Sequence, residues 1–339
     1  MKCHCGIPHN HAMHLLIPFA HCSSEGCDMV LRTLKLPQLQ KLLSSLAAQG
    51  AEQSDPLSLS APHERALARA LALPLADGMI PWAALQARQT LAAGGAWGFI
   101  TPCHWKIGSQ HVVMSGSALT DFSEQDARAL LGAMQPYFAE DGISLHYQQP
   151  RRWLAQSELF DGLATASLDR ASGHDVSNWL PTDSRAAPLR RLQSEMQMLL
   201  YNHPVNESRS ERGLPVVNSF WLSGTGALAP GLSPAAGAAP QVADSLREAA
   251  LNEDWSAWAQ AWEQLDTTEC AALLQALQRG QAVQLTLCGE RATQSFVSGL
   301  SLRAKRGNPL SWIAAACGLA MTGPLNFKRP SVTRFLEPL

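Results

Sequence analysis

Apolar residues recur at every third or fourth position in several stretches of the chain, the spacing that places them on one face of a helix. In residues 189–201 this face consists of Leu189, Leu192, Met196, Leu199 and Leu200. The same spacing predicts further helices at residues 29–48, 63–73, 78–85, 122–137, 154–168, 244–265 and 267–278. Ser123 is expected to cap the helix at 122–137, with Asp126 in its first turn.

Short runs rich in β-branched and aromatic residues lie between these segments and predict strands. They cover residues 14–19, 97–105, 111–114, 143–147, 216–222 and 283–287. Since helical and extended segments are interspersed, we expect an α/β fold with a mixed sheet flanked by helices.

Composition and charge restrict the class of protein. The chain has 339 residues, of which 46% are hydrophobic and 16% charged, as in a globular protein with one large or two ordinary domains. Its formal net charge of -2 gives no global basic field, so we expect no nucleic-acid or membrane partner. No apolar run has the length of a membrane span and no secretion signal is present, which predicts a cytoplasmic protein. The eight cysteines are scattered, which favours reduced thiols.

Polar side chains that suit an anion are densest in residues 199–226, after the helix at 189–201. Pro204 is expected to end that helix, and Gly213 and Pro215 then punctuate a polar loop before the strand at 216–222, which is expected to end in a glycine turn. Arginine forks, amides and glycine backbone N–H groups can bind phosphate or carboxylate. The candidate ligand-binding residues are His203, Asn206, Arg209, Arg212, Asn218, Gly224 and Gly226. In the alternative interpretation, the arginines are solvated, the asparagines form turns and His203 caps a helix end.

Residues 203–226, HPVNESRSERGLPVVNSFWLSGTG, resemble a segment of archaeal-type cofactor-independent phosphoglycerate mutases of the alkaline phosphatase superfamily. Longer parts resemble the bacterial RpfE-type regulatory proteins, which are often labelled phosphoglycerate mutase. These parts are MHLLIPFA from Met13, WGFITPCHW from Trp97, MQPYFAEDGISLHY from Met134 and LTLCGER from Leu285. The second resemblance covers most of residues 13–297, and together they imply an alkaline-phosphatase-like fold in a degenerate form.

The resemblance also implies where catalytic metals would be bound. Superfamily enzymes hold two metal ions, with an Asp-Gly pair after the first strand and an Asp-His pair after a late strand. Here His21 follows the first strand and Cys288-Gly289-Glu290-Arg291 the late one, so neither pattern is present. The RHG signature of cofactor-dependent mutases is absent as well. We therefore assign no catalytic or metal-binding residue, expect no cofactor, and expect a non-catalytic or regulatory protein that binds a phosphorylated metabolite or a protein partner.

Two other functions remain open. The chain is an active cofactor-independent phosphoglycerate mutase, or a related phosphoryl-transfer enzyme, if His21, Glu290 and Asp266 hold manganese or zinc. It is a scaffold if the stripe of Trp255, Trp258 and Trp262 docks a partner, which requires Trp258 to be exposed.

The sequence suggests five consecutive regions. They are a disordered leader (1–12), an α/β region containing the candidate site (13–226), a flexible loop rich in alanine, proline and glycine (227–241), C-terminal helices and a strand (242–299), and an atypical tail (300–339). The leader contains Cys3, His4, Cys5, His9 and His11, whose spacing does not fit a zinc knuckle. Residues 300–322 look like a translated intergenic repeat and are expected to form a poorly packed extension.

Overall fold

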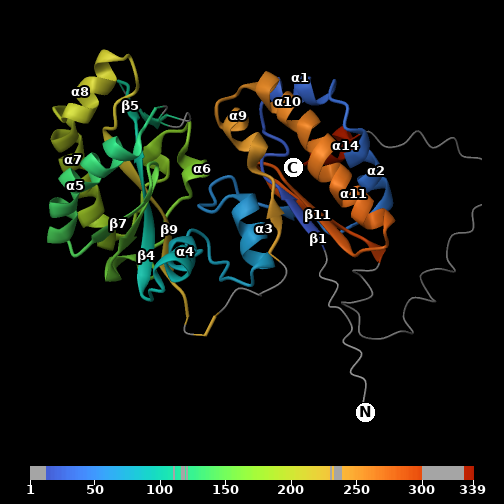
Figure 1. The fold of residues 1–339 in the computed structure, drawn as a ribbon, viewed down its shortest axis with the longest axis horizontal. Helices are drawn as coiled ribbons and strands as arrows, with labels where there is room; N and C mark the ends of the chain where they lie inside the picture. Colours follow the sequence, from blue (N-terminus) through green and yellow to red (C-terminus); the bar gives the residue numbers. More distant parts are fainter. Residues whose placement is uncertain are drawn as a thin grey trace, which may run out of the picture. The chain divides into compact units, whose positions relative to one another are not determined.

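The chain forms two compact units in a computed structural model (Figure 1). The structure describes residues 13–109, 111–115, 119, 121–229, 231–232, 239–299 and 332–339. Unit 1 comprises the described residues of 13–54 and 239–339, and unit 2 those of 55–232. Unit 2 is therefore an insertion in the sequence of unit 1. The expectations for the leader 1–12 and for the repeat at 300–322 fall outside the described residues.

Unit 1 is built on a mixed sheet that has six strands within the described residues, in the order β10-β1-β11-β12-β2, with β3 also paired to β12. Its strands are β1 (Met13–Ile17), β2 (Ala47–Ala48), β3 (Glu52–Gln53), β10 (Gln241–Val242), β11 (Val283–Cys288) and β12 (Ala292–Val297). β1 is parallel to both β10 and β11, whereas β12 is antiparallel to β11. The mixed sheet flanked by helices is confirmed.

The helices of unit 1 lie side by side next to this sheet (Figure 1). They are α1 (Glu25–Leu31), α2 (Pro37–Ser45), α9 (Arg247–Leu251), α10 (Trp255–Leu265), α11 (Ala271–Gln278) and α14 (Thr333–Leu336). The single helix expected at 29–48 is wrong, because the chain leaves α1 after Leu31 and Pro37 starts α2.

The break expected near residue 266 is a π-helical turn, Asp266–Cys270, which joins α10 to α11. The buried carboxylate of Asp266 accepts hydrogen bonds from the backbone N–H groups of Gln38 (3.1 Å) and Leu39 (2.7 Å) at the start of α2. The turn therefore supplies a cap to a neighbouring helix that has none of its own.

The tryptophan stripe belongs to the core of unit 1. Trp258 and Trp262 are 0% exposed, and their rings meet edge to face with centroids 6.1 Å apart. The indole N–H of Trp258 donates to the carbonyl of Phe19 at 3.0 Å. The exposure of Trp258 that the scaffold hypothesis required is therefore wrong.

The last eight residues of the sequence also join this core. Val332, Leu336 and Leu339 pack in the same cluster as the strands of unit 1. The carbonyl of Leu339 accepts from the N–H groups of Arg291 (2.8 Å) and Ala292 (2.7 Å). Residues 332–339 of the atypical tail are therefore packed, whereas the poor packing expected of residues 300–322 concerns residues outside the described ranges.

Unit 2 is built on an antiparallel sheet that has four strands within the described residues, in the order β7-β8-β4-β9, with a separate two-stranded β5-β6 ribbon. The strands are β4 (Ala96–Cys103), β5 (Trp105–Ile107), β6 (Val112–Met114), β7 (Ser144–Gln149), β8 (Arg152–Gln156) and β9 (Ser219–Ala227). Its helices are α3 (Pro62–Ala70), α4 (Trp82–Leu91), α5 (Glu124–Glu140), α6 (Leu168–Ala171), α7 (Ala187–Tyr201) and α8 (Pro204–Glu211).

Several expectations for unit 2 are confirmed. The hydroxyl of Ser123 accepts the N–H of Asp126 at the start of α5, as expected for an N-cap. α7 buries Leu189, Leu192, Met196 and Leu200 against the core that it shares with α5 and the sheet.

In the described part of both units, no helix combines the length and apolarity that a bilayer crossing requires.

The helix expected at 154–168 is wrong. Residues 152–156 form β8, which pairs with β4 on one side and β7 on the other. Trp153, Leu154 and Ala155 are 0% exposed, so the strand is buried on both faces. A continuous apolar run of this kind predicts a buried helix as readily as a buried strand, because apolar and polar residues do not alternate in it.

β9 does not end in a glycine turn but continues to Ala227 through two glycines with positive φ. Gly224 has φ 63° and Gly226 has φ 135°, and the register against β4 shifts at this point. A Cβ at Gly224 would lie 3.0 Å from the ring of Phe99. These glycines therefore permit a bulge inside the strand.

We expect Leu336→Ala to lower the free energy of unfolding of unit 1 by about 2–5 kcal/mol, because Leu336 is 0% exposed and its removal leaves a cavity. Met29→Ala is the control in the same unit, since Met29 is 62% exposed. Denaturant unfolding followed by tryptophan fluorescence measures both variants. Equal stability of the two would show that residues 332–339 do not belong to the core.

Candidate functional site

The parallel pairing of β1 with β11 brings the carboxyl ends of the two strands to one edge of the sheet, the position where α/β sheets bind ligands. Backbone hydrogen bonds continue the pairing beyond the strands. The N–H of Ala20 donates to Cys288 O at 2.8 Å, and that of Glu290 to His21 O at 3.1 Å. The two turns that the resemblance associates with metal half-sites therefore adjoin each other.

His21 is the central side chain of this edge and is 6% exposed. Its Nε2 lies 2.9 Å from Oδ1 of Asp28, in the first turn of α1. Its Nδ1 is buried and has no hydrogen-bond partner among the described residues. A carboxylate that holds an imidazole through one nitrogen fixes the orientation of the ring.

Glu290 belongs to the second turn, where its Oε2 accepts the backbone N–H of Ser23 at 2.8 Å. The structure thus brings His21 and Glu290 into adjoining turns, whereas Asp266 caps α2. In the described ranges, no three His, Cys, Asp or Glu side chains are grouped so as to hold a metal ion. These residues therefore do not fit the manganese or zinc set of the alternative function.

Two cysteines complete this edge. The backbone N–H of Cys22 donates to Sγ of Cys27 at 3.4 Å, and both residues are free thiols. The side-chain hydrogen bond between them raises the pKa of Cys22, with a contribution from burial, and lowers the pKa of Cys27.

The residues of the candidate anion site lie in unit 2, four of them around α8. Pro204 ends α7 as expected, but it also occupies the first turn of α8, so the expected polar loop is in part a helix. His203 is extended (φ −75°, ψ 135°), and its Nδ1 accepts the N–H of Val205 at 3.2 Å. Burial lowers the pKa of His203. The capping role of His203 is confirmed.

Asn206 connects α7, α8 and the approach to β9. Its Nδ2 donates to the carbonyls of Leu200 (2.8 Å) and Val217 (2.7 Å), and its Oδ1 accepts the N–H of Val217 at 2.8 Å. The side chain is buried, and its amide group forms these hydrogen bonds with the backbone. Asn218 acts similarly, since it donates to Trp105 O and accepts Trp105 N–H.

The two arginines differ in exposure. Arg209 is 0% exposed, and its guanidinium donates to Pro215 O (2.8 Å) and Asp121 O (3.1 Å) beside the ring of Phe122. Burial lowers the pKa of Arg209. Arg212 is exposed, and its Nε donates to Ser208 O at 3.3 Å. Solvation is thus confirmed for Arg212 and wrong for Arg209.

The structure groups His203, Asn206, Arg209 and Arg212 around α8, places Asn218 just before β9, and places Gly224 and Gly226 within β9. Of these seven, Arg212 offers a charged group in solvent. Binding of an anion by these residues stays a prediction.

A cluster of titratable side chains in unit 2 was not identified from the sequence. Nε2 of His63 lies 3.2 Å from Oδ2 of Asp169, and both side chains are largely buried. Glu64 accepts the N–H of Ala61 at 3.1 Å. Burial raises the pKa of Glu64 to about 7, against the lowering effect of His63 and with a smaller upward contribution from Asp169. The sequence signal was a glutamate in the first turn after Pro62, but its partner Asp169 is remote in sequence.

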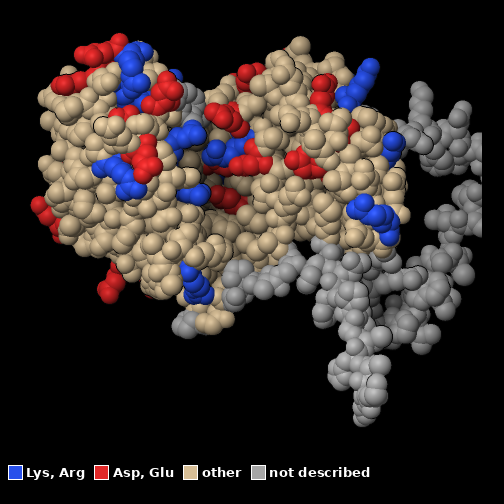
Figure 2. Space-filling model, in the orientation of Figure 1, with Lys and Arg blue, Asp and Glu red and all other residues tan. Residues whose placement is uncertain are grey.

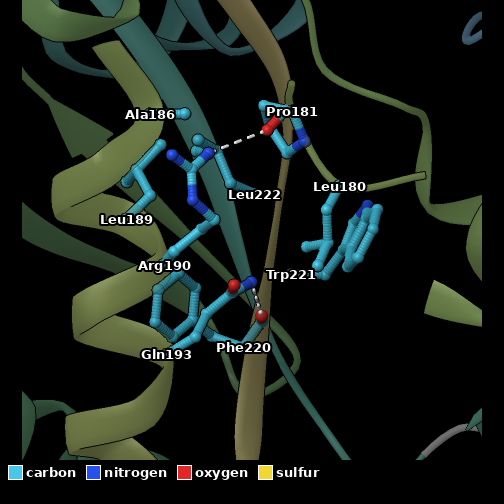
Figure 3. A pocket seen from close by; sticks show the side chains of 9 residues that line it. All are labelled: Leu180, Pro181, Ala186, Leu189, Arg190, Gln193, Phe220, Trp221 and Leu222. Carbon is cyan, nitrogen blue, oxygen red and sulfur yellow. Dashed lines mark hydrogen bonds between the residues drawn. The ribbon is translucent and has the colours of Figure 1, made fainter. Parts of the chain in front are cut away.

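A small pocket lies between α7 and β9 (Figure 3). Its lining is mostly apolar and includes Leu189, Phe220 and Leu222. Arg190 reaches across it to donate to Pro181 O at 3.1 Å, and Gln193 donates to Phe220 O. Both polar side chains thus have backbone partners, and the pocket suits an apolar group better than an anion.

No protein-family model matches the chain, and no curated protein matches it. The RpfE-type resemblance therefore rests on the residues quoted above. Solved structures similar to the chain include the cofactor-independent phosphoglycerate mutase from Thermoplasma acidophilum DSM 1728, at 14% identity over 84% of this chain and 89% of that chain, with a TM-score of 0.32. They also include the PH0037 protein from Pyrococcus horikoshii, at 12% identity over 85% and 88%, with a TM-score of 0.39. Neither likeness decides what this chain binds or does.

Asn206→Ala should lower the free energy of unfolding by about 2–4 kcal/mol, because it leaves the backbone N–H and carbonyl of Val217 without their partner and removes one of the bonds to Leu200 O. Asn202→Ala is the matched control, since Asn202 is exposed at the end of α7. Urea unfolding measures the difference. A loss no larger than the control's would mean that the Asn206 amide does not hold α8 in place.

Glu64 should make unit 2 less stable as the pH rises. Below about pH 4.5 the carboxyl is protonated in both the folded and the unfolded chain; between 4.5 and about 7 the unfolded chain releases its proton first, so folding becomes less favourable. Glu64→Gln, which cannot ionise, should therefore gain roughly 1–3 kcal/mol over the parent protein between pH 5 and pH 8. Urea unfolding at the two pH values measures this. The exposed Glu211 provides the control, Glu211→Gln, and an equal gain there would refute the assignment.

Proposed function

We propose that this chain is a phosphoglycerate-mutase-like protein that binds a phosphorylated small molecule without transferring its phosphoryl group. The observation that carries the proposal is the exposed guanidinium of Arg212, in residues 203–226, which resemble the mutases. The edge formed by the ends of β1 and β11, where the resemblance implies metals, has its side chains bonded to one another instead. Its turns are bonded to each other and to α1: His21 to Asp28, and Glu290 to Ser23. The proposal is the one expected from the sequence, a binding role without two-metal chemistry.

Charge at this edge also favours a binding site elsewhere. Asp28 and Glu290 both raise the pKa of the neighbouring thiols, which shows that their negative charges act there. A phosphate would be repelled by these carboxylates. On the face shown in Figure 2, acidic and basic side chains are interspersed in both units, so attraction of an anion would depend on a local group.

Arg212 is the residue on which we base phosphate binding. Arg212 is exposed and belongs to residues 203–226, which resemble the mutases. Its planar guanidinium carries several N–H donors, which suit a phosphate. Arg209, in contrast, is held by two backbone carbonyls in the core. A role for Arg209 in binding would be indirect, through the position of α8.

The experiment is a calorimetric titration of purified protein with 3-phosphoglycerate, with inorganic phosphate in a second arm. We expect saturable binding that Arg212→Ala weakens about 10- to 100-fold, the effect of losing a charged hydrogen bond. Arg128→Ala, which removes an exposed arginine from α5, should leave the affinity unchanged. Absence of binding to the parent protein would refute the proposal and favour a protein partner.

A coupled assay for interconversion of 2- and 3-phosphoglycerate, with added manganese or zinc, tests the alternative of an active metal-dependent enzyme. We expect no turnover above that of a mock purification. Turnover that disappears in His21→Ala, together with stoichiometric bound metal, would replace the proposal with the alternative. His21 is chosen for substitution because its Nδ1 has no hydrogen-bond partner among the described residues.

A further inference from the structure

The paired cysteines after β1 have a chemistry that the proposed function does not use. The hydrogen bond from the Cys22 backbone N–H to Sγ of Cys27, at 3.4 Å, places the two cysteines side by side. Cys22 is half-buried, whereas the other described cysteines, at positions 27, 103, 270 and 288, are buried. Cys22 is thus the described thiol that a reagent in solvent reaches first.

The surrounding backbone keeps this pair in place. Ser24 caps α1 by accepting the N–H of Cys27 at 3.1 Å, and Ser23 donates to Glu290 across the edge. A disulfide requires the two Cβ atoms to lie about 4 Å apart. Because Sγ of Cys27 lies 3.4 Å from the backbone nitrogen of Cys22, a local side-chain movement can bring the two sulfurs together.

We propose that Cys22 and Cys27 are a redox-active dithiol that exchanges with low-molecular-weight disulfides. The sulfur of Cys22 attacks one sulfur of the external disulfide, whose S–S bond breaks and releases one thiol. Cys27 then attacks the Cys22 sulfur and releases the second thiol, so that an internal S–S bond forms. The two cysteines lose two protons and two electrons, and the external disulfide gains both.

The charges around the two thiols favour one class of disulfide substrate over another. Asp28, Glu253 and Glu290 all act on the thiols and oppose ionisation there. The interaction with Cys22 works in the opposite direction and lowers the pKa of Cys27, which favours the thiolate of the second step. The raised pKa of Cys22 opposes the first attack, which therefore depends on the access of Cys22 to solvent. Three carboxylates attract a cationic disulfide and repel an anionic one. The substrate class is therefore a positively charged small disulfide.

The test uses the full chain in a Cys3→Ser, Cys5→Ser background, with cystamine as the cationic disulfide and oxidised glutathione as the anionic one. Cleavage after Glu25 separates Cys22 from Cys27 unless a disulfide joins them, and mass spectrometry detects the joined peptides. We expect them with cystamine, and their loss on reduction with dithiothreitol. Reaction spread equally over Cys103, Cys270 and Cys288 would overturn the proposal.

Two single variants separate the steps. Cys27→Ser should stop at a mixed disulfide on Cys22, because the second thiol is missing. Cys22→Ser should protect Cys27 from modification, because Cys27 is buried. Modification of Cys27 at the parental rate in Cys22→Ser would overturn the order of attack, and native fluorescence spectra of both variants establish that they are folded.

The preference for a cationic disulfide is measured by comparing the reaction rates of the two disulfides. At low salt, cystamine should react about tenfold faster than oxidised glutathione, and the ratio should fall as salt is added. Glu253→Gln should reduce the ratio, whereas Glu248→Gln, a nearby exposed glutamate, should not. Equal rates for the two disulfides in the parent protein would refute the substrate class.

Discussion

The parallel pairing of β1 with β11 is the interaction on which the rest of unit 1 depends. It joins residues about 270 positions apart, as the bond between His14 and Thr286 shows. Along β11, Val283, Leu285 and Leu287 point into the core that the helices cover. Thr286 points to the other face, where its hydroxyl is hydrogen-bonded to that of Ser295 on β12. The same pairing places His21 beside Glu290 and thus creates the candidate edge.

The sequence predicted individual elements well where their pattern was regular. The helix over 189–201 and the cap at Ser123 follow from spacing and from local chemistry, and both are present. The pattern failed where burial erased the alternation, as in β8, and where glycines allowed a strand to continue, as in β9. It also contains no signal that unit 2 is inserted in unit 1, because insertion is a property of pairing between distant strands.

The candidate site shows a different limit of sequence analysis. A polar side chain that binds a ligand and one that binds a backbone carbonyl look alike in a sequence. Asn206 and Asn218 satisfy their amides on the backbone, and Arg209 does so with Asp121, which is 88 positions away. Glu64 and Asp169 were overlooked for the same reason, since their proximity depends on the fold. Only exposure distinguishes Arg212 from these residues.

The insertion of unit 2 has a consequence for biosynthesis. Ribosomes add roughly 5–20 residues per second, so the first strand waits from about a quarter of a minute to nearly a minute before β11 exists. All strands of unit 2 pair within residues 96–227 and are complete before that time. The nascent chain therefore carries residues 13–17 without their strand partner while unit 2 is already able to fold. During this interval the apolar strand Met13–Ile17 is open to pairing with other chains, a hazard that ends when β11 is made.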